Sequence, residues 1–112
     1  MLRAAAAAVV FSLVAAPALA ADGAQLFNMQ CKMCHAGSPM GPTLAGVAGG
    51  PVAAKPFAYS PALKAKGGTW TDANLNAYLK APGAFAPGTR MMISVPSEES
   101  RTAIIGYLKT LK

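Results

Sequence analysis

The sequence has few side chains of the kind that bind transition metals: it contains two cysteines and one histidine among 112 residues. This set is too small for the four-ligand Cys and His sites of structural zinc. A disulfide between Cys31 and Cys34 would close a very small loop and add little stability. A C-x-x-C redox site is also disfavoured, because the βαβ pattern that hosts such sites is absent.

Internal repeats, basic runs and, after the N-terminal segment, low-complexity tracts are also absent. The formal net charge is +6, but the lysines are scattered and no nucleic-acid-binding motif is recognisable. These features argue against a nucleic-acid partner. The positive charge is explained by solvated surface or by a weak docking field for an acidic partner.

The longest apolar run lies at the N-terminus and predicts a secretory signal peptide over residues 1–20. Arg3 supplies a short positive region, residues 4–16 are apolar, and Ala18-Leu19-Ala20 is a small-residue cleavage site. Cleavage would leave one domain, residues 21–112, with nine basic and four acidic residues.

An uncleaved membrane anchor is the alternative for this segment. The 18 uncharged residues from Ala4 to Ala21 include Pro17. As a helix they would reach about 27 Å, just short of the hydrocarbon core of a bilayer. We therefore expect an exported, periplasmic protein with no transmembrane segment after cleavage.

The segment Cys31-Lys32-Met33-Cys34-His35 has the spacing used to attach haem covalently. Two thiols three positions apart can each add to one vinyl group of a protoporphyrin, and the adjacent imidazole can ligate the iron. The motif predicts one covalent haem c with His35 as an axial iron ligand. A buried haem would also enlarge the core, which is small in a domain of this size.

Clear helix signals and few strand signals predict an all-α fold. Residues 36–59 and 81–89 are rich in Gly and Pro, so we expect irregular loops there, wrapped around the cofactor. About four short helices are expected: from Asp22 toward Cys34, from Ser60-Pro61 to Gly67-Gly68, from Thr71-Asp72 to Pro82, and from Ser97 onward.

The second axial position cannot be another imidazole, which leaves lysine, methionine, water or no ligand. Met29 and Met33 share the predicted helix of His35 and would lie on its side of the haem. Met40 follows His35 by only five residues. Its chain could reach around the macrocycle only under strain.

Met91 and Met92 are far enough along the chain to reach the other face of the haem. The bend Pro87-Gly88-Thr89-Arg90 would present Met91 inward and leave Met92 pointing elsewhere. Both methionines could instead be apolar fillers, the usual use of this residue. Spacing alone favours Met91 without deciding the question.

Several segments together resemble the class I c-type cytochromes, small monohaem electron carriers. After the haem motif they occur in the family's order across nearly all of the predicted mature chain: Gly41-Pro42-Thr43-Leu44-Ala45-Gly46, Phe57-Ala58-Tyr59-Ser60, Gly68-Thr69-Trp70-Thr71, Tyr78-Leu79-Lys80-Ala81-Pro82, Pro87-Gly88-Thr89-Arg90-Met91 and Tyr107-Leu108-Lys109.

The resemblance implies the cytochrome c fold and axial ligation of iron by His35 and Met91. It further implies that the Pro42 carbonyl accepts the Nδ1 proton of His35. Tyr78 and Thr89 would lie near the Met91 sulfur, and Tyr59 and Trp70 would donate toward a haem propionate. Gly23, Phe27, Gly106 and Tyr107 would form the crossing of the first and last helices, where close backbone approach would explain a glycine inside a helix at position 106.

Two departures from the family pattern concern the haem surroundings. Only five residues separate His35 from Gly41, fewer than in mitochondrial members, and Gly50 stands where many members have an arginine facing a propionate. How this chain satisfies the propionates is therefore an open question at the sequence level.

A closed iron coordination shell favours one-electron transfer between redox donor and acceptor proteins, not catalysis. Docking would be transient and near the haem edge, with Lys32, Lys55, Lys80 and Arg90 as the basic candidates. The chain would be a monomer or a subunit of a redox complex. The alternatives are a cytochrome subunit of a dehydrogenase or oxidase, and a haem protein whose labile Met91 yields to small ligands.

Overall fold

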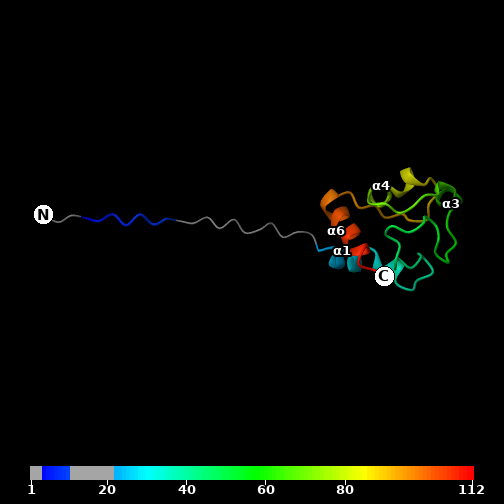
Figure 1. The fold of residues 1–112 in the computed structure, drawn as a ribbon, viewed down its shortest axis with the longest axis horizontal. Helices are drawn as coiled ribbons and strands as arrows, with labels where there is room; N and C mark the ends of the chain where they lie inside the picture. Colours follow the sequence, from blue (N-terminus) through cyan, green and yellow to red (C-terminus); the bar gives the residue numbers. More distant parts are fainter. Residues whose placement is uncertain (1–3, 11–21) are drawn as a thin grey trace.

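The computed structural model describes residues 4–10 and 22–112 and confirms the all-α prediction (Figure 1). Strand-like pairing within these residues is limited to one isolated bridge between Pro51 and Thr69. The described helices are α1 (Gly23–Gln30), α2 (Lys32–His35), α3 (Pro61–Lys66), α4 (Asp72–Lys80), α5 (Pro82–Phe85) and α6 (Glu98–Leu108).

The helices begin where the sequence predicts them, because each predicted cap is made. The Asp22 carboxylate accepts hydrogen bonds from the Ala24 and Gln25 amides. Three hydroxyl groups each accept from the amide three residues further on: Ser60 from Leu63, Thr71 from Asn74, and Ser97 from Ser100. Capping satisfies amides that have no partner inside the helix.

Two boundaries differ from the expectation. The first predicted helix is broken at Cys31, which separates α1 from α2. Pro82 ends α4 as predicted but also opens α5, where a loop was expected. Proline suits the first position of a helix, because its missing amide hydrogen would have no partner there and its φ is already helical.

α1 and α6 cross at close range beside the haem-attachment motif (Figure 1). A Cβ added to Gly23 would overlap the carbonyl oxygen of Ala103, so the crossing requires glycine at this position. The rings of Phe27 and Tyr107 meet at the same crossing, with their centroids 5.1 Å apart. The expectation for Gly106 was wrong, because nothing lies within 4 Å of a Cβ built there.

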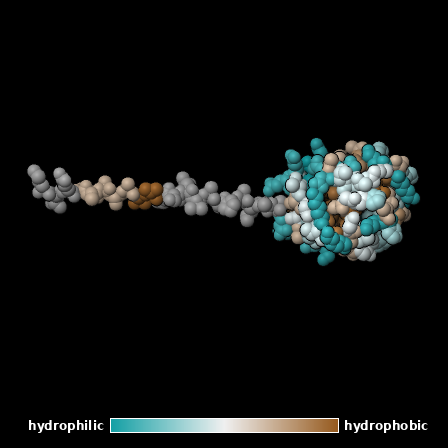
Figure 2. All heavy atoms as spheres, viewed as in Figure 1, coloured by the Kyte–Doolittle hydropathy of each residue, from teal (hydrophilic) through white to brown (hydrophobic). Residues whose placement is uncertain are grey.

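The core includes side chains from α1, α3, α4 and α6 and from the loops that join them: Phe27, Leu63, Trp70, Leu75, Leu79, Ala86, Val95, Ile104, Ile105 and Leu108. Hydrophilic residues cover much of the face seen in Figure 2, with hydrophobic residues visible between them.

The predicted signal peptide lies largely outside the described residues. Residues 4–10 form no regular element and are exposed, and residues 1–3 and 11–20 are not described. Within the part of the chain that the structure describes, no helix combines the length and the apolar character needed to cross a bilayer.

Candidate functional site

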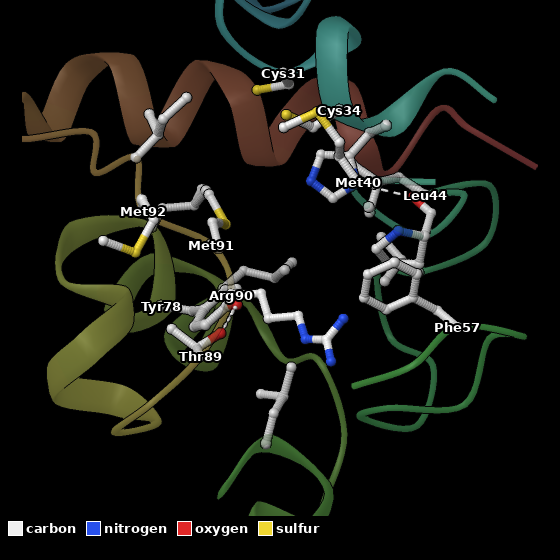
Figure 3. A pocket seen from close by; sticks show the side chains of 18 of the residues that line it. Cys31, Cys34, Met40, Leu44, Phe57, Tyr78, Thr89, Arg90, Met91 and Met92 are labelled. Carbon is white, nitrogen blue, oxygen red and sulfur yellow. Dashed lines mark hydrogen bonds between the residues drawn. The ribbon is translucent and has the colours of Figure 1, made fainter. Parts of the chain in front are cut away.

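A cavity of about 400 Å³ lies between the helices and the long loops, and the predicted site residues converge on it (Figure 3). All nine line it: Cys31, Cys34, His35, Pro42, Tyr59, Trp70, Tyr78, Thr89 and Met91. Leucine, valine, isoleucine and phenylalanine side chains complete most of the wall. An apolar cavity of this size with a few convergent polar groups is typical of a ligand or cofactor site.

The two cysteines are free, half-buried thiols at the α2 side of the cavity. The break at Cys31 turns the chain between the two helices. Burial raises the pKa of the Cys31 thiol, and the neighbouring Cys34 adds to the effect. Both sulfurs therefore border an apolar space that a covalently attached group could fill.

The imidazole of His35 is oriented by the loop that follows it. Its Nδ1 lies 2.8 Å from the carbonyl oxygen of Pro42, as the family resemblance implied. Because a carbonyl only accepts, Nδ1 carries the proton and Nε2 keeps a lone pair for a metal. Gly41 permits this approach, since a Cβ there would lie 2.9 Å from His35 Cε1 and 2.8 Å from the Cys34 oxygen.

Met91 and Met92 differ in the way that the bend before them predicts. Met91 is half-buried and packs against the core, whereas Met92 is 89% exposed. The bend is closed by a hydrogen bond from the Thr89 amide to the Ala86 carbonyl, 2.9 Å long. Met91 is thus the thioether that both packs against the core and is separated from the His35 segment by most of the domain.

Tyr78 and Thr89 join α4 to the Met91 segment through a hydrogen bond of 2.7 Å between their hydroxyl groups. Burial raises the pKa of Tyr78; the Thr89 contact lowers it, and the nearby Tyr59 raises it further. Tyr78 also packs against Trp70 and Phe85, with ring centroids 5.1 and 5.5 Å away. This aromatic cluster supports the wall beneath Met91.

Tyr59 and Trp70 both border the cavity, as the resemblance implied for residues that donate to a propionate. The Tyr59 hydroxyl accepts a hydrogen bond of 3.1 Å from the Lys55 amide, which leaves its own proton free to donate. The next residue, Ser60, also lines the cavity with a 5% exposed side chain. Its oxygen accepts from Leu63, so its hydroxyl proton is a further donor.

Arg101 is a residue that the sequence reasoning missed. It is 5% exposed, and its guanidinium donates to Asn76 and to the carbonyls of Val95 and Pro96. These bonds hold the segment that follows Met91 against α4 and α6. A signal was present, because Arg101 falls on the apolar stripe of the last helix with Ile104, Ile105 and Leu108.

These residues fit a haem. Two thiols stand beside an imidazole with a free Nε2, and the half-buried thioether of Met91 reaches the same apolar cavity from a distant segment. Sulfur and imidazole ligands of this kind bind iron in c-type haem proteins.

The fold and the site together define a small all-α protein built to hold a covalent haem. Residues 20–112 match the sequence profile described as "Cytochrome c". The chain is 38% identical to cytochrome c of Tetrahymena pyriformis, covering 82% of this chain and 88% of that protein. It is also 38% identical to cytochrome c2 of Rhodomicrobium vannielii, covering 79% of this chain and 75% of that protein.

Solved structures agree with these sequence matches. Cytochrome cH from Methylobacterium extorquens superposes with a TM-score of 0.74 at 38% identity, covering 81% of this chain and 97% of that chain. Ferricytochrome c2 from Rhodopseudomonas palustris superposes with a TM-score of 0.72 at 32% identity, covering 80% of this chain and 96% of that chain. The chain belongs to the cytochrome c family, whose members bind one covalent haem c and transfer electrons between redox proteins without being enzymes.

Proposed function

We propose that this chain is an exported, periplasmic one-electron carrier whose haem iron is ligated by His35 and Met91. One observation carries the proposal: His35, whose Nε2 is free, and the half-buried Met91 border one cavity together with both cysteines. Its similarity to bacterial relatives such as cytochrome c2 supports export, as does the predicted signal peptide of residues 1–20.

The haem supplies the chemistry, a one-electron change between ferric and ferrous iron. The protein holds and orients it: Cys31 and Cys34 attach it, the Pro42 carbonyl fixes the His35 ring, and the Tyr78–Thr89 pair supports the Met91 segment. With His35 and Met91 both holding the iron, no iron site would stay open to a substrate, and thioether ligation would raise the reduction potential.

The matched variants Met91→Leu and Met92→Leu test the ligand assignment in the haem-loaded protein. Met91→Leu should abolish the ferric charge-transfer band of thioether ligation, lower the potential and allow rapid binding of carbon monoxide to the reduced protein. Met92→Leu should change none of these. Equal spectra for Met91→Leu and the parent protein would rule out Met91, and rapid carbon monoxide binding by the parent would favour the labile-ligand alternative.

A second candidate function, a subunit of a dehydrogenase or oxidase complex, is favoured by the cavity rim. We define the rim as four cavity-lining apolar residues with large exposed fractions: Met33 (83%), Met40 (65%), Met92 (89%) and Ile93 (49%). Stable partners often meet through apolar patches of this kind. Copurification of the haem-loaded protein with a dehydrogenase or oxidase would support this role, and its isolation as a free monomer would support the carrier.

A further inference from the structure

The cavity offers very little charge to a cofactor that carries two carboxylates. No aspartate, glutamate or lysine is found among its described lining residues, and the basic ones are His35 and Arg90. With His35 assigned to the iron, Arg90 is the permanent cation of the site. A carboxylate removed from water without a cation or hydrogen-bond donors is costly.

The backbone is crowded at the position where many family members have an arginine. Gly50 does not line the cavity, and a Cβ built on it would lie 3.0 Å from the Gly46 carbonyl oxygen. The Gly49–Gly50 strip is also hydrogen-bonded to Trp70, through bonds of 2.8 Å in both directions. The backbone leaves little freedom for a side chain at this point.

Apart from Arg90, no described lysine or arginine lines the cavity, and four of them have contacts elsewhere. Within the described residues, Lys55 lies against Gly46, Lys66 lies over the Phe85 ring, Arg101 binds the Val95 and Pro96 carbonyls, and Lys109 pairs with Asp72. Arg90 has no hydrogen bond or ion pair with any described residue. Figure 3 shows its side chain extending across the cavity, from the Thr89–Met91 segment toward the side where Phe57 lies.

We propose that the Arg90 guanidinium is the counterion of a haem propionate in this protein. It would replace the arginine that many family members have at the position of Gly50. This inference rests on the proposed function only in needing a haem in this cavity. The guanidinium would form charge-assisted hydrogen bonds to the carboxylate, with the free hydroxyl protons of Tyr59 and Ser60 as additional donors. Arg90 is thereby removed from the set of docking cations.

The test compares Arg90→Gln, Arg90→Lys and the surface control Lys64→Gln in haem-loaded protein. Lys64 is exposed on α3 and does not line the cavity. Removing a cation beside the haem stabilises ferric iron, so Arg90→Gln should lower the midpoint potential. The expected size is a change of about tenfold in the ferric-to-ferrous ratio, or about 59 mV. Arg90→Lys keeps the charge and should retain most of the potential.

Although Arg90 is exposed, salt and pH separate a close pair between its guanidinium and a propionate from a surface charge that acts at long range. The Arg90→Gln shift should persist near 1 M salt, where the Debye length is about 3 Å, while any Lys64→Gln shift should vanish. An unpaired propionate should also bind a proton more readily and give Arg90→Gln a steeper dependence of potential on pH. Apart from Cys31, Cys34 and His35, the ionisable side chains that line the cavity are Tyr59, Tyr78 and Arg90 itself, and burial raises the pKa of Tyr78.

Three outcomes would overturn the assignment: an Arg90→Gln shift no larger than that of Lys64→Gln, a shift lost in high salt, or an equal shift in Arg90→Lys. Failure of the axial-ligand proposal is recognised separately. In that case the parent protein would lack the thioether charge-transfer band, while the comparison of Arg90→Gln, Arg90→Lys and Lys64→Gln could still be made.

Discussion

The position of the His35 imidazole depends on the absence of a Cβ at Gly41. Gly41 has no Cβ, and only this lets the chain turn beneath the His35 ring so that the Pro42 carbonyl reaches Nδ1 at 2.8 Å. The hydrogen bond could be predicted from the family resemblance. The steric reason for the glycine before Pro42 could not, because it depends on a contact between the loop and the ring.

Gly41→Ala should therefore displace the His35 ring or the loop. We expect a loss of about 1–3 kcal/mol in the free energy of unfolding of the haem-loaded protein, the usual cost of overpacking. Gly83→Ala is the matched control, since nothing lies within 4 Å of its Cβ and its φ is not positive. Chemical denaturation measures both, and equal stabilities would show that the Gly41 contact relaxes at no cost.

Capping residues in the sequence predicted where helices begin better than where they are interrupted. The caps at Asp22, Ser60, Thr71 and Ser97 could be identified because each satisfies amides a few residues away. The break at Cys31 and the contacts of Arg101 could not be predicted, because they depend on how α1, α4 and α6 pack.

The two glycines of the α1–α6 crossing should respond to alanine in opposite ways. Gly23→Ala introduces an overlap with the Ala103 carbonyl, so it should separate the helices and destabilise the protein by about 1–3 kcal/mol. Gly106→Ala meets nothing and should stabilise α6 by up to about 1 kcal/mol, the difference in helix propensity. Thermal unfolding of the two variants measures this contrast, which fails if both shift the midpoint in the same direction.

For the whole molecule, the composition indicated a basic surface, but only the structure separates the charges from the cavity. Lys32 and Lys80 are exposed and do not line the cavity, Lys55 is half-buried, and the rim itself is apolar. Of the four predicted docking cations, Lys32 and Lys80 are exposed away from the cavity, whereas Arg90 is exposed and also lines it. Under the proposed carrier function, docking would depend on a weak long-range field around a largely apolar contact area.

The rate of electron transfer to a redox partner should fall as ionic strength rises, because salt shortens the reach of this field from about 30 Å at 0.01 M to about 3 Å at 1 M. Lys80→Glu should lower the second-order rate at low salt more than Lys64→Glu does. Stopped-flow mixing at several salt concentrations measures both effects. If the rate constant does not change with salt concentration, docking is instead governed by the apolar rim.

The crossing of α1 and α6 also determines when the domain can close during synthesis of the chain. The haem-attachment motif follows α1 directly, while α6 ends near the C-terminus. At about 5–20 residues per second of synthesis, the motif leaves the ribosome on the order of 4 to 15 s before the helix that α1 packs against. During that interval α1 has no α6 to pack against, so the domain cannot yet close over the two thiols.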